Sequence, residues 1–378
     1  MTVPAAISGI REREGTRADA RADALALLFV VLGLAARLLA ARRSFVTPDE
    51  ALHLDIARKA TVVDTYRATL TNAHPPLFEL LLYFWQRIVG PGWQLCLLPA
   101  ACGTAFLWTA YKWGASLFGK SSALLMLALL AFLPSFVLLS SELRGYSLML
   151  WLVASSLAAL ELAFRKASSR WLAVSAALAG LALLSHYAAL RFAIAAVVYG
   201  AARLRAERSD PRLVRVWFVS QAAVAAVFLL LYASHVSKLR GGRLEQEAQA
   251  GWLRASYFHG KEESALVFLG RQTAALFHFL FSTPAAAIVA GLLFVCGAAL
   301  LVAKRQPSTI LLLSPFVLAG AGGLLRLYPY GGSRHSIDLG LFACAAIGVA
   351  LARLSRDRPW VALALATLIA PAGFAVSW

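Results

Sequence analysis

The sequence is poor in cysteine and in acidic residues, and both shortages limit what the protein can be. Its few cysteines lie in apolar stretches and none forms a CxxC pair. We therefore interpret them as small buried side chains, not as a metal site or a disulfide framework. They are Cys96, Cys102, Cys296 and Cys344. Asp and Glu number 19 against 36 Lys and Arg, which gives a formal net charge of +17.

Charged residues of either sign are scarce as well. They make up 15% of the chain, hydrophobic residues make up 60%, and the mean hydropathy is +0.70. Because a soluble domain is about half apolar, this excess predicts a polytopic membrane protein. The basic charge has two interpretations, nucleic-acid binding or cytoplasmic loops. Short Arg runs between apolar stretches, such as 203–215, favour cytoplasmic loops. We expect membrane lipids as surroundings and no nucleic acid as a partner.

Several motifs are absent. There is no P-loop and no dinucleotide-binding glycine pattern, so we expect no nucleotide at the site. There is no His-Glu-x-x-His or Gly-x-Ser-x-Gly motif, which argues against a membrane protease or other hydrolase. No linker divides the chain, and the first apolar run has no small-residue cleavage site. We expect a cytoplasmic Arg-rich tail over 1–21, without regular structure, and one integral membrane domain over 22–378.

Long apolar runs predict an all-α fold with about 11–13 transmembrane helices. Two further stretches, 76–90 and 265–282, are short or weak, and the topology is consistent only if neither crosses the membrane singly. The candidate spans are 23–40, 93–111, 121–139, 147–164, 171–189, 190–202, 216–234, 285–303, 309–325, 337–352 and 360–376.

Basic residues set the predicted orientation. The basic tail and the basic loops belong on the cytoplasmic side, which makes the N-terminus cytoplasmic. The remaining loops then lie outside, and each carries side chains that can do chemistry. Polar groups at a membrane boundary usually have a function, so we expect an active site on the outer face of the cell membrane. These outer loops are 41–75, 140–146, 186–191, 235–264 and 326–336.

The first outer loop contains a predicted short amphipathic helix on the membrane surface. Thr47 is its expected cap and Pro48 its first residue. Asp49 and Glu50 follow. They could serve as paired carboxylates for acid–base work, or they could only complement the helix dipole. Together with His53, they are also candidate ligands of a divalent metal ion, although their spacing is not diagnostic.

Four other clusters are candidates for substrate binding. His74 before two prolines holds an imidazole at the lipid boundary, or is incidental to a helix start. Arg144 either contacts an anionic head group, with Tyr146 beside it, or only pairs with Glu142. A turn between two spans carries His186 and Tyr187.

The last cluster is Gly331-Gly332-Ser333-Arg334-His335. Its glycines could let backbone N–H groups approach a phosphate, and the Ser, Arg and His side chains add donors. A helix beginning near residue 335 would also point its positive N-terminal end toward this phosphate. The alternative is a glycine turn followed by an Arg that reaches toward the membrane surface.

In this order, the clusters resemble those of the GT-C superfamily, the multipass glycosyltransferases that use polyprenyl-phosphate sugars. The resemblance is to bacterial relatives of the dolichyl-phosphate-mannose protein mannosyltransferases (family 39) and of the lipid A aminoarabinose transferases. It rests on Pro48-Asp49-Glu50, His74-Pro75-Pro76-Leu77, the Ser-x-x-x-Arg-x-Tyr-Ser-Leu pattern over 140–148, and the late Gly-Gly-Ser-Arg-His. It covers about 22–200 as a catalytic module, whereas 201–378 is a variable part with the outer loop 235–264.

The resemblance implies an inverting transfer of a hexosyl or pentosyl group to a hydroxyl of a lipid, glycan or protein. Asp49 would be the base or an acid that orients the acceptor, and Glu50 its partner. The leaving phosphate would be stabilised by Arg144, His74, Arg334 and His335, and Tyr146 would line the donor site. Relatives often add a soluble outer domain, so we expect a small or lipid-bound acceptor or a partner protein. The alternative function is a transporter or flippase for lipid-linked precursors, which predicts inverted repeats that we do not find.

Overall fold

The computed structural model describes residues 5–70, 72–207, 210–355, 360 and 363–366, and within these ranges it contains helices and turns but no strand. The all-α prediction is therefore confirmed. The longer helices are α1 (Ala5–Arg43), α2 (Pro48–Ala57), α3 (Val62–Thr69), α4 (Leu77–Val89), α5 (Leu97–Phe118), α6 (Lys120–Phe132), α7 (Pro134–Leu139), α8 (Tyr146–Arg165), α9 (Ser169–Ser185), α10 (Ala189–Ala206), α11 (Pro211–Leu231), α13 (Arg243–Ala250), α14 (Ala265–Phe281), α15 (Pro284–Ala303), α16 (Ser308–Leu324) and α17 (Ile337–Leu354).

Five helical segments of the described chain are long and apolar enough to cross a membrane. Four shorter apolar helices accompany them, and α5 and α10 have 22 and 18 residues. The predicted span 360–376 lies mostly outside the described residues, so the number of crossings stays a prediction. The five segments are Asp19–Arg43, Tyr146–Arg165, Pro211–Leu239, Pro284–Ala303 and Arg334–Leu354.

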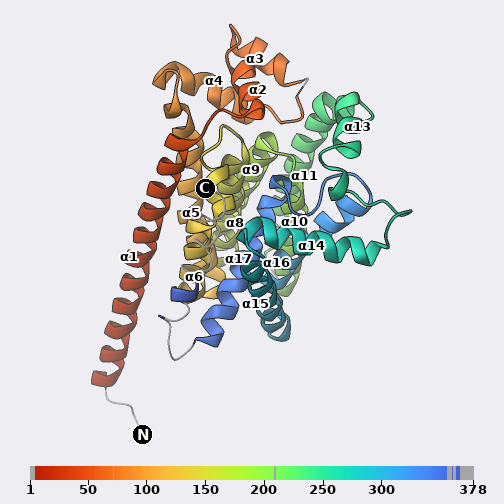
Figure 1. Cartoon of the computed structure of the whole chain (residues 1–378). Coiled ribbons are helices and arrows are strands. Elements are labelled where there is room, and N and C mark those ends of the chain that lie inside the picture. Colours follow the sequence, from red (N-terminus) through yellow and green to blue (C-terminus); the bar gives the residue numbers. More distant parts are fainter. Residues whose placement is uncertain (1–4, 71, 208–209, 356–359, 361–362, 367–378) are drawn as a thin grey trace.

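The bundle has two distinct ends (Figure 1). The helices α2, α3 and α4 cover one of them, which we call the site end. At the other, which we call the basic end, α5 ends, α6 begins, and α15 and α17 end. With 13 residues, α4 is about 20 Å long, too short for a hydrocarbon core of about 30 Å. It packs on α2 and α3, so 76–90 is not a crossing of its own, as predicted.

One expectation about the remaining segments needs correction. The helix α1 begins at Ala5, so the expectation of a tail without regular structure is wrong for the described part of 1–21. The outer loop predicted over 235–264 is partly helical, since α11 continues through a π-helical turn (Tyr232–Val236) and α13 follows. In 265–282, α14 runs across the bundle instead of along it (Figure 1). This orientation agrees with the prediction that 265–282 does not cross singly.

The core is formed by α8 between α5 and α9, and by α17 between α6 and α15. Small residues allow these close contacts. A β-carbon on Gly297 of α15 would lie 2.0 Å from the Ala346 carbonyl oxygen, and one on Gly348 would lie 2.5 Å from the Ser122 carbonyl oxygen. The helices α5, α6, α8 and α17 therefore form a rigid frame that ends at the site.

A break divides the predicted span 121–139. Pro134 has no N–H and cannot bond to the carbonyl of Leu130, so α6 ends at Phe132 and α7 restarts at Pro134. The side chain of Arg37, completely buried in α1, donates to the carbonyl oxygens of Leu130 at 3.3 Å and Ala131 at 3.1 Å. The guanidinium thus satisfies the acceptors that the proline leaves free, and it fixes α7 beside the site.

We predict that Arg37→Lys destabilises the protein by about 1–3 kcal/mol, the cost of leaving one buried carbonyl without a donor. Lys keeps the charge but cannot divide its donors as the guanidinium fork does. Thermal unfolding in detergent measures the change, and the exposed Arg170→Lys serves as the control. Equal unfolding temperatures for the two variants would show that Arg37 does not support α7.

Candidate functional site

The helix α2 begins with the predicted cap. The Thr47 hydroxyl accepts from the backbone N–H of Glu50, and the Glu50 carboxylate accepts from the Thr47 backbone N–H at 2.9 Å. The other carboxylate oxygen, Oε1, accepts from the backbone N–H of Leu143 at 2.8 Å. Both oxygens of this buried group therefore hold protein donors. Glu50 thus fastens α2 to the segment before α8. These contacts favour a positioning role, and a catalytic role beside Asp49 stays a prediction.

Asp49 carries the central contact of the site. Its Oδ2 accepts from Arg144 Nη2 at 2.5 Å and from Arg334 Nη2 at 2.5 Å. The three residues come from α2, from the segment before α8 and from the turn before α17. The prediction that the acid beside Pro48 meets the late basic cluster is thus confirmed. The Asp49 side chain is 51% exposed, so its other oxygen remains accessible to a ligand.

These contacts define the ionisation of the acidic pair. The hydrogen bond from Arg144, with a further contribution from Arg334, holds the pKa of Asp49 below its ordinary value. Glu142 lies near the same guanidinium, with Oε2 3.1 Å from Arg144 Nε. Burial raises the pKa of Glu142 above its ordinary value, in spite of the nearby Arg144 charge. Arg144 therefore pairs with Glu142 and also with Asp49, and its contact with an anionic head group stays a prediction.

A cavity of about 350 Å³ opens beside this network. Glu142, Ser333, Arg334 and His335 provide its polar wall. The rest of the lining comes from α7, α14 and the segment after α13 and is apolar apart from Ser135. Its apolar members are Leu138, Leu139, Trp252, Leu253 and Phe279. A phosphate with an attached hydrocarbon chain would match such a mixed lining.

Three polar atoms at or beside this cavity are buried and have no hydrogen-bond partner among the described residues. They are Ser333 Oγ and His335 Nδ1 on its lining and Tyr146 Oη, whose ring lies next to that of His335. Buried polar atoms in a folded protein are nearly always bonded, and each orphan costs about 1–3 kcal/mol. Three of them at one place favour a polar ligand that supplies the missing partners.

The glycine turn serves packing rather than direct contact with a phosphate. Gly331 has φ +122°, and a β-carbon there would lie 2.1 Å from Gln272 Oε1 of α14. A β-carbon on Gly332 would lie 2.8 Å from the Ala275 carbonyl oxygen. The backbone N–H of Gly331 donates to Ser336 Oγ at 3.3 Å. The glycines therefore seat the turn against α14, and the ligand donors are the side chains that follow.

An ion pair between α10 and α17 also fixes the turn before α17. Arg191 of α10 donates to the Asp338 carboxylate at 2.5 and 3.2 Å and to the His335 carbonyl oxygen at 2.7 Å. Its guanidinium also lies 4.9 Å from the centre of the Tyr328 ring. The helix α17 thus begins in a position set by α10, and this holds Arg334 and His335 at the cavity.

Aromatic and imidazole rings form a chain that begins at α2. The centroid of the His74 ring lies 5.0 Å from that of His53 and 5.7 Å from that of His186. The Tyr146 ring follows, 4.5 Å from His186 and 6.5 Å from His335. Five side chains that are far apart in sequence therefore make one connected cluster beside the Asp49 network.

Two histidines of this ring cluster have lowered pKa values. Burial lowers the pKa of His74 and of His186 well below the ordinary value. The backbone N–H of Ala188 donates to His186 Nδ1 at 3.1 Å, so this nitrogen acts as an acceptor in a neutral ring. The predicted contact of His74 with a phosphate stays a prediction, and the lowered pKa favours a neutral imidazole in that role.

Tyr187 stands apart from the other predicted residues. Its hydroxyl is buried and has no partner in the described part of the chain. Burial raises the pKa of its phenol, and the charge that contributes is that of Glu79, not that of the arginines. The pair predicted at the turn therefore separates, with His186 in the ring cluster and Tyr187 outside it.

The candidate metal ligands do not fit a common ion. The Oδ2 of Asp49 is held by two guanidinium groups, and both oxygens of Glu50 are bonded to Thr47 and Leu143. His53 Nδ1 lies 2.9 Å from Glu79 Oε1. No group of three or more His, Cys, Asp or Glu within the described ranges could hold a metal ion. Two guanidinium groups therefore lie at the carboxylate oxygen of Asp49, one of the candidate metal ligands.

One aromatic residue at the cavity could not be predicted from the sequence. Trp252 lies in an irregular segment after α13, and 64% of its surface is exposed although it lines the cavity. A single aromatic residue in a polar loop has no pattern that predicts this position.

Residues 73–232 match a family described as dolichyl-phosphate-mannose-protein mannosyltransferase. Among solved structures, ArnT from Cupriavidus metallidurans bound to undecaprenyl phosphate superposes with a TM-score of 0.58 at 18% identity, over 90% of this chain and 62% of that one. The Archaeoglobus fulgidus oligosaccharyltransferase tethered to an acceptor peptide gives 0.55 at 14%, over 93% and 53%. As AglB, in complex with an inhibitory peptide and a dolichol-phosphate, it gives 0.55 at 13%, over 93% and 54%.

These comparisons confirm the GT-C resemblance and the fold that it implies. No curated protein sequence matches the chain. The chain spans between about half and three fifths of the length of the solved proteins above. The family match includes His74, Arg144, Tyr146 and His186 but neither Asp49 nor Arg334.

Proposed function

We propose that this GT-C-type membrane protein transfers a sugar from a polyprenyl-phosphate donor to an acceptor hydroxyl. The observation that carries the proposal is the set of three unpartnered polar atoms, of Ser333, His335 and Tyr146, at a cavity whose lining is otherwise mostly apolar. A sugar phosphate supplies polar partners, and its polyprenyl chain fits the apolar side. The solved ArnT binds undecaprenyl phosphate and the solved AglB a dolichol-phosphate and a peptide, which supports a lipid-linked donor and a lipid, glycan or protein acceptor.

The chemistry is a single displacement. The acceptor oxygen forms a bond to the anomeric carbon while the bond between that carbon and the phosphate oxygen breaks. The electron pair leaves with the lipid phosphate, the acceptor proton passes to Asp49 Oδ1, and the anomeric centre inverts. Asp49 is ionised at neutral pH because Arg144 and Arg334 bind it. One carboxylate oxygen is thus fixed by the protein while the other takes the proton.

Arg334 links the two halves of this reaction. It touches Asp49 and also lines the cavity beside Ser333. A phosphate that accepts from Arg334 and the free Ser333 hydroxyl would lie next to the carboxylate that activates the acceptor. Preorganised donors aimed at a developing negative charge give large rate effects in a water-poor cavity. We expect Arg334 to be the main source of leaving-group stabilisation.

Transfer explains the arrangement better than transport. The chemical side chains gather at one end of the bundle, whereas transport predicts a site near the middle of the membrane. We place the site end on the outer face of the cytoplasmic membrane, with the N-terminus in the cytoplasm. Basic residues at the opposite end, including Arg165, Lys304 and Arg353, support this orientation under the positive-inside rule.

The pH profile separates two candidates for the base. If Asp49 is the base, its lowered pKa places the acid limb of the rate below the ordinary aspartate value of 3.8, so the rate stays flat from pH 8 to pH 5. If Glu142 is the base, its raised pKa moves the limb upward from the ordinary glutamate value of 4.5, so the rate falls within this range. We predict the flat profile in single-turnover assays. A limb that disappears in Glu142→Gln would assign the base to Glu142 instead.

Trp252 is suited to stack on a sugar ring, because aromatic faces at a cavity entrance contact the apolar faces of sugars. We predict that Trp252→Ala raises KM for the lipid-linked sugar about 10-fold, as expected for a stacking contact of about 1–1.5 kcal/mol, with a smaller change in kcat. The control is Trp360→Ala, which removes another exposed tryptophan and should leave KM unchanged. An unchanged KM would remove Trp252 from the substrate site.

The direct test uses purified protein in liposomes with a panel of undecaprenyl-phosphate hexoses and pentoses. Mass spectrometry measures the release of undecaprenyl phosphate and the mass of the glycosylated acceptor. We expect one sugar to be consumed, and only with intact Asp49. Mass spectrometry of cell-envelope glycans from a deletion strain identifies the acceptor. If no donor is consumed in the presence of envelope lipids and glycans, the transferase proposal is wrong.

A further inference from the structure

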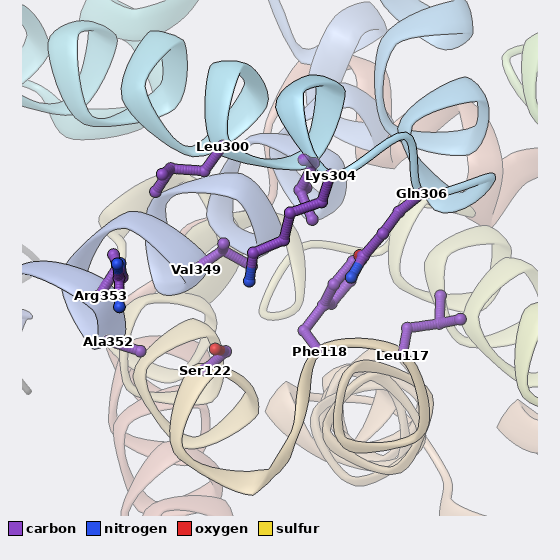
Figure 2. Close-up of a pocket in the computed structure, with 10 residues that line it drawn as sticks. Leu117, Phe118, Ser122, Leu300, Lys304, Gln306, Val349, Ala352 and Arg353 are labelled. Atoms are coloured by element: carbon purple, nitrogen blue, oxygen red, sulfur yellow. The ribbon is translucent and has the colours of Figure 1, made fainter.

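We propose that the basic end of the bundle holds a second site, which binds the head group of an anionic phospholipid. It is a cavity of about 210 Å³ between the end of α15, the end of α17 and the corner between α5 and α6 (Figure 2). Ligand sites for whole molecules usually have about 300–1,000 Å³. A cavity of this size instead suits a head group whose acyl chains remain outside, in the membrane.

Two cations line the cavity without a compensating acid. Lys304 follows the last residue of α15, and Arg353 lies in the last turn of α17. Neither forms an ion pair in the part of the chain that the structure describes. Their neighbour Lys120, in contrast, pairs with Asp23 at 2.8 Å. The positive charge at this cavity is therefore available to an external anion.

The floor of the cavity adds uncharged donors. The helix α6 begins here after Gly119, which has no side chain to cap it, so the first backbone N–H groups of α6 have no capping partner. Ser122, in this first turn, is 8% exposed and lines the cavity, and it makes no side-chain hydrogen bond to any described residue. Gln306 stands on the opposite side. A helix start with an unbonded hydroxyl in its first turn favours an anion such as phosphate.

The rest of the surroundings is apolar, and this selects a lipid over a soluble anion. The cavity is completed by Leu117, Phe118, Leu300, Leu301 and Val349. From it, the outer face of α15 continues as an exposed apolar strip with Val302, Val295 and Leu292 at 53%, 63% and 67% exposure. One acyl chain lying along this strip would keep the phosphate at the level of Lys304. Charge and shape therefore point to a phospholipid with net negative charge.

Native mass spectrometry tests this site. Wild-type protein and the double variant Lys304→Ala/Arg353→Ala are titrated with phosphatidylglycerol and, separately, with phosphatidylcholine. Each Lys or Arg near a membrane surface strengthens the binding of anionic lipids. We therefore expect the loss of both cations to weaken the binding of phosphatidylglycerol roughly 30-fold. The matched control is Arg165→Ala/Arg170→Ala, which removes two exposed cations that do not line this cavity. We expect wild-type affinity for phosphatidylglycerol in this control.

Three results would overturn the proposal: equal binding of the two lipids by the wild type, equal losses in the two double variants, or displacement of phosphatidylglycerol by inorganic phosphate. The last would identify a soluble anion as the ligand. If the double variant does not fold, Lys304→Gln and Arg353→Gln are measured singly, with a smaller loss expected for each. Sugar transfer should continue in all of these variants, because the cavity lies at the end opposite Asp49, so the two proposals fail independently.

Discussion

Asp49→Asn should reduce sugar transfer about 10²–10⁴-fold, the range expected for removing a positioned general base. Asn has nearly the shape of Asp and can still accept from Arg144 and Arg334, so the site should stay assembled. It cannot take a proton from the acceptor. Binding of undecaprenyl phosphate should be unchanged or tighter, because the two arginines lose an internal competitor for their charge. Single-turnover rates and lipid affinity, measured on the same preparation, separate these effects.

A control from the same helix makes the result specific. Asp55→Asn removes an exposed carboxylate of α2 that pairs only with Lys59, four residues away. We expect normal transfer in this variant. Near-normal turnover by Asp49→Asn would overturn the assignment of the base, and a parallel loss in Asp55→Asn would indicate damage to α2 rather than lost chemistry.

Arg334→Met should lower both the affinity for undecaprenyl phosphate and the rate of transfer. Losing a preorganised donor to a developing charge typically costs about 10²–10³ in rate. Lys at this position keeps the charge but not the forked donors that reach Asp49 and the cavity together, so Arg334→Lys should recover only part of the activity. Lipid-binding titrations and single-turnover assays provide the two readouts.

Arg326→Met is the matched control for Arg334→Met. Arg326 precedes the same turn, is exposed and bonds to Gln249, away from Asp49. It should transfer sugar at the wild-type rate. A loss below about 3-fold in Arg334→Met, against the 10²–10³ expected from its proposed role, would remove Arg334 from the leaving-group site.

The start of α2 could be predicted because capping is local. Thr47, Pro48 and Glu50 contain the whole signal within four residues, and the structure contains that cap. The second bond of Glu50, to a backbone N–H 93 residues away, had no local signal. For that reason the sequence suggested Glu50 only as a catalytic partner of Asp49, whereas its contacts in the structure favour a positioning role.

The meeting of Asp49 with Arg334 could be predicted from topology alone. The positive-inside rule placed both residues on one side of the membrane, although 285 positions separate them. The break at Pro134 was missed because the apolar run continues through it. Arg37, which supports that break, appears in the sequence only as one Arg within an apolar stretch. Its partners are backbone carbonyls, which no sequence pattern marks.

The roles of the glycines and of Trp252 depend on packing. Gly331 and Gly332 suggested a phosphate cradle, but the neighbouring α14 leaves no room for a β-carbon at either position. Trp252 reaches the cavity from a segment that was predicted only as a loop. Such contacts between distant elements are decided by the final fold, so the sequence could identify the site but not its complete lining.

The most direct test of this account is an experimental structure of the full chain with undecaprenyl phosphate bound. We predict phosphate density in the cavity beside α7, within hydrogen-bond distance of Ser333 Oγ and the Arg334 guanidinium, with the polyprenyl chain along Leu138 and Phe279. Phosphate density that lies elsewhere on the protein, with Ser333 and Arg334 still unoccupied, would contradict the account.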